Sequence, residues 1–398
     1  MFSPIVQAPP DSILGLTDAF KKDPNPAKVN LGVGVFKDHT GATPILKSVK
    51  AAEKILVEQA TTKSYMPISG DPVYDQLVQE MILGKGHAVL TENRARTAHT
   101  PGGTAALRVG GDFLKKFALS AKVWISSPTW ANHKGVFTAA GFQTAEYAYY
   151  DAATKGLAWD KMKAALEAVP AGDIVLLHAC CHNPTGVDLN DVQWLEVARI
   201  AQSKGWIPFV DFAYQGYGTG LEEDRAGLLA LAKVCPEIVV ASSFSKNFGL
   251  YQDRTGALTI IAANAKEADA AFSHVELVIR VNYSNPPAHG GLVVTTILKD
   301  ANLRRQWQDE LIGMRDHIAS LRKTFVQALA KHGVSGDFSF ISKQKGMFSF
   351  SGLTDEQVKF LRDKKSIYIV GGGRINVAGI STGNIDYLCT SIREALQA

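Results

Sequence analysis

The chain has 398 residues, of which 46% are hydrophobic and 20% are charged. These proportions are typical of a folded protein with a large apolar core, so they exclude a disordered chain and a fibrous repeat. Its net charge is only +4, without a long basic run, and we therefore expect no nucleic acid partner. No signal segment begins the sequence and no apolar stretch is long enough for a membrane span, which predicts a cytoplasmic protein without a membrane partner.

The first elements in chain order are two helices. Residues 11–28, DSILGLTDAFKKDPNPAK, have the pattern of a capped helix that two prolines end. Further on, Gly102, Gly103 and Thr104 begin a second helical pattern. Because the first backbone N–H groups of a helix are free and lie at the positive end of its dipole, this helix start is a natural phosphate site.

Short apolar runs follow and alternate with helical patterns. The runs are residues 122–127, 173–179, 206–212, 237–243 and 257–263. Each is almost continuously apolar, which is typical of strands that helices cover on both faces. The pattern predicts an α/β fold with a doubly wound domain and a mostly parallel central sheet.

The stretch between the second and third runs predicts a helix, which completes a β–α–β unit. It begins at the polar residues of DLND, places Val192, Leu195 and Ala198 at helical spacing, and ends at Gly205.

The C-terminal part has another pattern. Residues 314–333 predict a long amphipathic helix, and the segments FSFIS and GMFSFSG predict short strands after it. We therefore predict an N-terminal arm with part of a smaller domain at 1–40, a large domain at 41–310, and the rest of the smaller α+β domain at 311–398.

The cysteines, Cys180, Cys181, Cys235 and Cys389, are too few and too bunched for a disulfide framework and are interpreted as reduced thiols. HACCH, residues 178–182, contains residue types that bind zinc. However, neighbours on a strand point to opposite faces, and no second ligand pair has zinc spacing. We predict no metal site.

Polar side chains follow neighbouring strands, where ligands of open α/β sheets bind. Asn183 follows the second run, Asp211 and Tyr214 follow the third, and Lys246 follows the fourth. A lysine can form a Schiff base with an aldehyde, and a nearby carboxylate can keep a pyridine nitrogen protonated. Each residue alone is compatible with a surface charge or a turn, but together they favour a phosphorylated aromatic aldehyde as cofactor.

Several segments resemble one family, in order along nearly the whole chain. They are NLGVGVFKD, TPGGTAALRVG, PTWANHK, HACCHNPTG, FDFAYQGYG, SSFSKNFGLYQDRTG, YSNPPAHG and RINVAG. The chain resembles the fold-type I aspartate and aromatic amino acid aminotransferases (class I, subgroup Iα), which depend on pyridoxal 5′-phosphate. The resemblance implies transfer of the amino group of aspartate or of tyrosine, phenylalanine and tryptophan to 2-oxoglutarate by a ping-pong mechanism.

By this resemblance, Lys246 holds the cofactor as a Schiff base and then moves the substrate proton. Asp211 pairs with the pyridine nitrogen and His133 supports Asp211, while Asn183 and Tyr214 contact the phenolic oxygen of the ring. The phosphate site is implied to contain Gly102, Gly103, Thr104, Ser243, Ser245, Arg254 and, from a partner subunit, Tyr65.

The same resemblance implies which residues select the substrate. Trp130 stacks on the cofactor ring, and Trp130 and Asn183 also contact the substrate. Arg374, close to the backbone of Gly34, binds the α-carboxylate, and Arg280 of the other subunit binds the side-chain carboxylate of a dicarboxylic substrate. Since residues act across an interface, the resemblance implies an obligate homodimer.

The preferred amino acid stays open. The aspartate branch of the family is favoured by Val35, Lys37, Thr43, Thr104 and Asn285. Ser64 leaves aromatic substrates possible, so we expect dual specificity.

Other functions have less support. A nicotinamide-dependent dehydrogenase needs G-x-G-x-x-G after a strand, which GVGVFK at 32–37 does not supply. A non-catalytic binding protein would be expected to lose the lysine or a carboxylate-binding arginine, and this chain keeps them. A β-lyase or decarboxylase with the same cofactor remains open, although the paired arginines argue against it.

Overall fold

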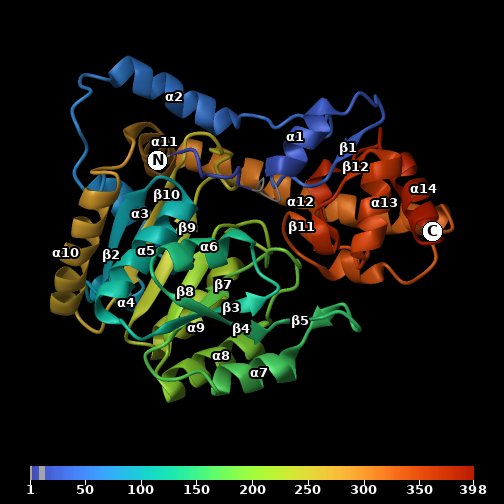
Figure 1. Ribbon diagram of the computed structural model, residues 1–398. Coiled ribbons are helices and arrows are strands. Elements are labelled where there is room, and N and C mark those ends of the chain that lie inside the picture. The colour runs from blue at the N-terminus through green and yellow to red at the C-terminus, as the bar shows by residue number, and fades with distance from the viewer. Residues whose placement is uncertain (1, 9–13) are drawn as a thin grey trace. The chain divides into compact units, whose positions relative to one another are not determined.

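The computed structural model describes residues 2–8 and 14–398 (Figure 1). Contacts within the chain divide it into two compact units, Pro44–Asp316 and the pair Met1–Thr43 with His317–Ala398. The two units are described separately below. No helix in the described part of the chain combines the length and the apolar character that crossing a membrane requires.

A seven-stranded sheet forms the centre of Pro44–Asp316. Its strands, in spatial order, are β2 (Ala95–Thr100), β10 (Gly256–Ile261), β9 (Ile238–Ser243), β8 (Ile207–Phe212), β7 (Ile174–His178), β3 (Lys122–Ser127) and β4 (Gln143–Ala148). Only β10 runs antiparallel to its neighbours, and the pairs from β9 to β4 are parallel. The prediction of an α/β fold with a mostly parallel central sheet is confirmed.

All five strands predicted from apolar runs are present, but the sequence analysis missed β2 and β4. Both contain many polar residues and lie at the sheet edges. In β2 the side chains of Thr97, His99 and Thr100 are nevertheless buried, and the hydroxyls of Thr97 and Thr259 lie 2.8 Å apart. Hydrophobic patterns cannot reveal such a strand.

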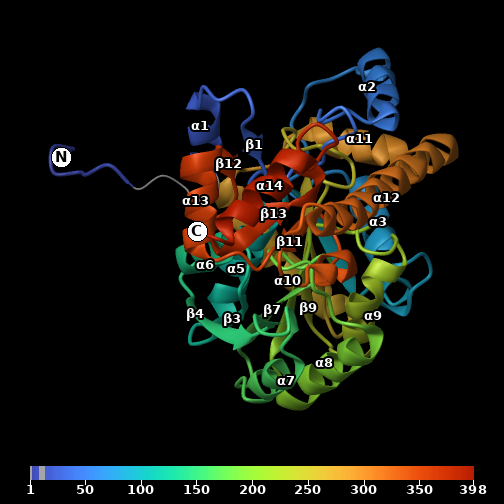
Figure 2. The ribbon, with the colours of Figure 1, turned by 90° about the vertical axis from the view of Figure 1, so that its right-hand side faces the viewer.

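Helices cover both faces of the sheet (Figures 1 and 2). On one face, α5 (Gly103–Phe117), α6 (Asn132–Ala139) and α10 (Ala265–Asn282) enclose a core that includes Phe137 and Phe209. On the other face lie α8 (Asp191–Lys204) and α9 (Ala226–Val234). Further elements of this unit are α2 (Lys47–Gln59), α3 (Pro72–Leu83), α4 (Ala88–Thr91), β5 (Tyr150–Asp151), β6 (Gly156–Leu157), α7 (Trp159–Glu167) and α11 (Ala288–Lys299).

Helix α8 is present with the expected end, since Gly205 caps it in the left-handed conformation. Of the three apolar residues that indicated the helix, however, only Ala198 lies on its buried face. Val192 is 75% exposed and Leu195 is 58% exposed. The helix instead buries a second apolar stripe that contains Trp194 and Val197, because the large indole ring removes more apolar surface from water.

The other unit contains two small pairs of strands. Strand β1 (Val29–Asn30) pairs with β12 (Ile367–Tyr368), and β11 (Phe348–Phe350) pairs with β13 (Arg374–Asn376). Its helices are α1 (Leu14–Lys22), α13 (Asp355–Lys365), α14 (Ile385–Ala395) and the C-terminal part of α12 (Ala301–Lys331).

The structure corrects the prediction for this part of the chain in two places. Helix α12 begins at Ala301, not near residue 314, and FSFIS forms a 3-10 turn at Ser339–Lys343 instead of a strand. The start of the predicted N-terminal helix, residues 11–13, lies outside the described residues.

The packing of α9 on α8 depends on a glycine. A Cβ at Gly227 would overlap the ring of Trp194. We expect Gly227→Ala to lower the free energy of unfolding by about 1 to 3 kcal/mol, because the core cannot accept the added methyl group without shifting. Gly313→Ala is the matched control. Gly313 also lies in a helix, α12, but a Cβ there meets no atom within 4 Å, so this change should stabilise by about 0.5 to 1 kcal/mol. Urea unfolding of both variants measures the difference, and equal effects would contradict this account of the packing.

Candidate active site

The carboxyl ends of neighbouring strands bring the predicted polar residues together. In the parallel register, Asp211 of β8 lies opposite His178 of β7 and Ala241 of β9. Lys246 follows the end of β9, and its Nζ lies 4.9 Å from the ring centre of Tyr214, which follows β8. The sheet therefore places an amine, a phenol and a carboxylate at one edge.

Burial changes the charge state of the amine. Loss of contact with water lowers the pKa of Lys246 to about 8; the Asp211 carboxylate raises it and the Arg254 guanidinium lowers it. A lysine with this pKa carries a substantial neutral fraction near physiological pH. In that form it is a nucleophile and a base.

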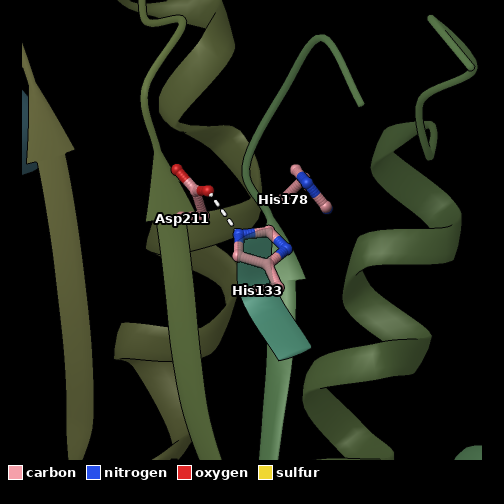
Figure 3. A group of neighbouring side chains, drawn as sticks. All are labelled: His133, His178 and Asp211. Carbon is pink, nitrogen blue, oxygen red and sulfur yellow. Dashed lines mark hydrogen bonds and ion pairs between the residues drawn. The ribbon is translucent and has the colours of Figure 1, made fainter. Parts of the chain in front are cut away.

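The Asp211 carboxylate is held by its neighbours. Its Oδ2 lies 2.9 Å from His133 Nε2 (Figure 3), and its Oδ1 accepts from the backbone N–H of Ala213 at 3.1 Å. The other ring nitrogen of His133 lies 2.8 Å from the hydroxyl of Thr129. Burial by itself would raise the pKa of Asp211, but the bond to His133 and nearby charges, including Lys246, lower it below its usual value. The group is thus an oriented carboxylate anion.

His178 adds a second imidazole to this group. Its ring centre lies 5.2 Å from that of His133, and potential ligand atoms of His133, His178 and Asp211 lie within 4.8 Å of one another. Neither ring nitrogen of His178 has a hydrogen-bond partner among the described residues, and burial lowers its pKa to about 3, so the ring is neutral. His133 Nε2 and Asp211 Oδ2, which face each other, already form a hydrogen bond. This bond favours the interpretation that the histidine orients the Asp211 carboxylate.

An anion recess lies at the start of α5. Gly102 caps the helix with a φ of +83°, and a Cβ there would overlap the guanidinium of Arg254. Arg254 Nη1 donates to Ser245 Oγ at 3.3 Å, and a Cβ on Gly103 would lie 3.0 Å from Ser243 Cβ. Free helix N–H groups, two hydroxyls and a guanidinium thus converge where only glycine leaves room, and this donor set suits a phosphate.

A buried amide in the segment after β7 suggests a ligand as well. Asn183 is only 6% exposed, and its Oδ1 has no hydrogen-bond partner among the described residues. A buried polar atom without a partner is costly, and a polar group of a ligand would remove that cost. The amine, carboxylate, amide and recess together match the aldehyde, pyridine nitrogen, phenolic oxygen and phosphate of pyridoxal phosphate.

Two of the site residues predicted from the sequence are exposed in the single chain. Tyr65 is 92% exposed, and Arg280, which donates to Ser284 Oγ, is also exposed. Trp130, in contrast, lies beside His133, with the two ring centres 5.2 Å apart.

Two predicted residues, Gly34 and Arg374, belong to the other unit. Arg374 is 3% exposed, donates to the carbonyl of Gly32, and places its guanidinium carbon 4.2 Å from the ring centre of Phe348. A Cβ on Gly34 would lie 2.6 Å from the same ring. Gly34 therefore leaves room for the ring on which the arginine rests.

The sequence analysis gave no site role to Thr129 or His178. Both occur in motifs that it quoted, PTWANHK and HACCHNPTG. For His178 the residue type was noticed, but only as a possible zinc ligand. Its position beside Asp211 depends on the register of two strands, which the sequence does not state.

Comparison with known proteins identifies the family. Residues 26–392 match the family described as aminotransferase class I and II. The chain belongs to this family. The sequence-based predictions of the family, the fold and the enzyme class are thereby confirmed.

Individual relatives match this aminotransferase over their full length. The aspartate aminotransferase of Escherichia coli is 53% identical over 392 residues, covering 98% of this chain and 99% of that protein. The aromatic-amino-acid aminotransferase of Pseudomonas aeruginosa is 47% identical over 393 residues, covering 99% and 98%. A structure of the Burkholderia pseudomallei aromatic-amino-acid aminotransferase, covalently bound to pyridoxal phosphate, has a TM-score of 0.97 at 47% identity, covering 100% and 99%.

The charges around Lys246 predict how its amine titrates. In protein freed of any bound aldehyde, reductive methylation of Lys246 should reach half its maximal rate near pH 8. Asp211→Asn should lower this midpoint by about half a unit or more, because the attraction that favours the ammonium ion is lost. Arg254→Gln should raise the midpoint, because a repulsion is lost. Mass spectrometry of the Lys246 peptide across pH gives the three midpoints, and shifts in the same direction for both variants would refute this electrostatic arrangement.

Proposed function

We propose that this aminotransferase uses pyridoxal phosphate to move the amino group of aspartate, and also of tyrosine, phenylalanine and tryptophan, to 2-oxoglutarate. The observation that carries the proposal is the buried Lys246 amine, with its pKa near 8, beside the oriented Asp211 carboxylate. Full-length relatives of similar identity carry aspartate and aromatic names, which supports dual specificity.

The division of work between cofactor and protein follows from the site. When bound, pyridoxal phosphate supplies an aldehyde that joins primary amines and a protonated ring that withdraws electrons. Asp211 keeps the proton on the pyridine nitrogen, since His133 fixes its carboxylate. The Lys246 amine takes the proton from the Cα of the amino acid substrate. A base whose pKa lies near the working pH is well suited to this transfer.

The other groups of the site hold the ring and the phosphate. Asn183 and Tyr214 contact the phenolic oxygen, and Trp130 lies against the ring. The recess at α5 takes the phosphate, with donors from Gly103, Thr104, Ser243, Ser245 and Arg254. The Gly102 N–H donates to the Thr100 carbonyl at 2.7 Å, so Gly102 contributes space and not a donor. Because these donors are in place before binding, little ordering is needed when the dianion enters.

Two arginines select the substrate in this proposal. Arg374 binds the α-carboxylate through its planar fork, and its bond to Gly32 together with the Phe348 ring fixes the plane of the guanidinium. Arg280 binds the second carboxylate of aspartate, glutamate or 2-oxoglutarate. Aromatic substrates lack that group, so they do not depend on Arg280 in the same way.

We propose a homodimer in which each chain lends Tyr65 and Arg280 to the active site of its partner. Both residues are exposed in the single chain, and apolar side chains in the same unit are exposed as well, including Val57 at 77% and Val281 at 86%. A second copy would cover such surface. In this proposal Pro44–Asp316 contains the cofactor domain, and the other unit is the smaller domain. The location is the cytoplasm, since the four cysteines are buried and form no disulfide.

The reaction can be tested directly. Purified protein with pyridoxal phosphate should be yellow, and borohydride should fix the cofactor to Lys246, as peptide mass analysis detects. Aspartate and the three aromatic amino acids should all support glutamate formation from 2-oxoglutarate, with kcat/KM values that establish their order. Colourless protein without a labelled lysine would refute the cofactor, and turnover of one substrate class alone would refute dual specificity.

A mixing experiment tests the shared active site. Lys246→Ala and Arg280→Gln should each be poorly active with aspartate. If Arg280 serves the partner, dimers formed from both variants contain one site with both native residues. Random mixing should then restore about a quarter of the wild-type aspartate activity, as expected for a symmetric dimer.

The control for this experiment is the activity of Arg280→Gln with phenylalanine, which should fall far less than its activity with aspartate. Absence of recovery on mixing would place Arg280 in the site of its own chain, or outside the site.

A further inference from the structure

The hydroxyl of Tyr217 bonds to the main chain of Lys246. Tyr217 is 2% exposed, and its Oη donates to the Lys246 carbonyl at 3.1 Å and lies 3.4 Å from Met314 Sδ. The same carbonyl accepts the backbone N–H of Gly249 at 3.0 Å. Since a carbonyl oxygen has two lone pairs, these two donors fix its direction.

Tyr217 belongs to the turn that carries Tyr214. The backbone N–H of Tyr217 donates to the Tyr214 carbonyl at 3.0 Å. The Tyr217 hydroxyl therefore connects the turn after β8, which presents the phenol, with the turn after β9, which presents the amine. Lys246 Nζ lies 4.9 Å from the ring centre of Tyr214.

Both connected segments are stiffly braced. After β8, the carboxylate of Asp224 accepts the backbone N–H groups of Gly216 at 2.9 Å and Thr219 at 2.7 Å. After β9, the Asn247 carbonyl accepts from Trp307 Nε1 at 2.7 Å. These bonds brace each segment separately, and the Tyr217 hydroxyl is the contact that fixes the Lys246 residue relative to the Tyr214 turn.

We propose that Tyr217 is a positioning residue for Lys246: its hydroxyl fixes the lysine main chain against the Tyr214 turn and so holds the amine at its buried place. This role adds a residue to the proposed function. The expected effect of Tyr217 on turnover rests on that proposed function. Tyr217→Phe would keep the aromatic ring and remove only the hydrogen bond of its hydroxyl.

The chain offers a matched control. Tyr147 is 1% exposed, and its hydroxyl donates to the Leu176 carbonyl at 2.8 Å. Tyr147→Phe therefore removes the same kind of buried bond from a strand, without touching the Lys246 turn. Comparison of the two variants separates positioning of the amine from loss of a buried hydrogen bond in general.

The first readout is the pH midpoint of Lys246 methylation, which needs no turnover. Burial is the main reason that the pKa of this amine lies near 8, so an amine held less firmly should spend more time near water. We expect Tyr217→Phe to raise the midpoint by about half a unit. In the holoenzyme, kcat should fall about two- to tenfold with KM nearly unchanged. Tyr147→Phe should change neither quantity, although both variants lower the melting temperature slightly.

A midpoint and kcat of Tyr217→Phe equal to those of Tyr147→Phe would overturn the proposal. Replacement of Tyr217 by 4-aminophenylalanine, which keeps a donor at the ring end, should restore the wild-type midpoint; a midpoint that stays raised would assign the effect to packing and equally overturn it. If wild-type protein binds no pyridoxal phosphate, the proposed function fails while the methylation midpoints still decide the role of Tyr217.

Discussion

The constraint on which this structure depends is the burial of an amine beside a carboxylate anion. A lysine that loses its contact with water favours the neutral form, and a neighbouring carboxylate limits that shift. Lys246, Asp211 and Arg254 balance these effects at a pKa near 8. A single substitution among them changes the balance, because charges interact strongly where water is scarce.

The rest of the large unit keeps these groups in place. Parallel strands align the ends of β7, β8 and β9, so residues distant in sequence reach the same edge. Hydrogen bonds then fix each group: His133 orients Asp211, and Tyr217 ties the Lys246 main chain to the neighbouring turn. The anion recess is also fixed by the structure around it, because the glycines at the start of α5 leave the space that the donors surround.

Much of the site was predictable from the sequence because its residues stand at strand ends within recognisable motifs. Lys246, Asp211 and Asn183 each follow an apolar run. The prediction of secondary structure and of buried residues failed where it relied on polarity or on the local spacing of apolar residues. Strand β2 is rich in polar residues, FSFIS forms a 3-10 turn, and Val192 and Leu195 on α8 are exposed. In each case packing against distant segments decided the outcome, and local periodicity does not contain that information.

The sequence by itself determined the family, the α/β fold and the residue types of the chemistry, because motifs and apolar runs are properties of neighbouring residues. Only the tertiary structure decided that His178 lies beside His133 and Asp211, that Tyr217 reaches the Lys246 carbonyl, and that Arg374 rests on Phe348. These contacts join residues far apart in the chain. They exist because strand register and helix packing bring distant segments within hydrogen-bond distance, and burial then sets the charge of each group.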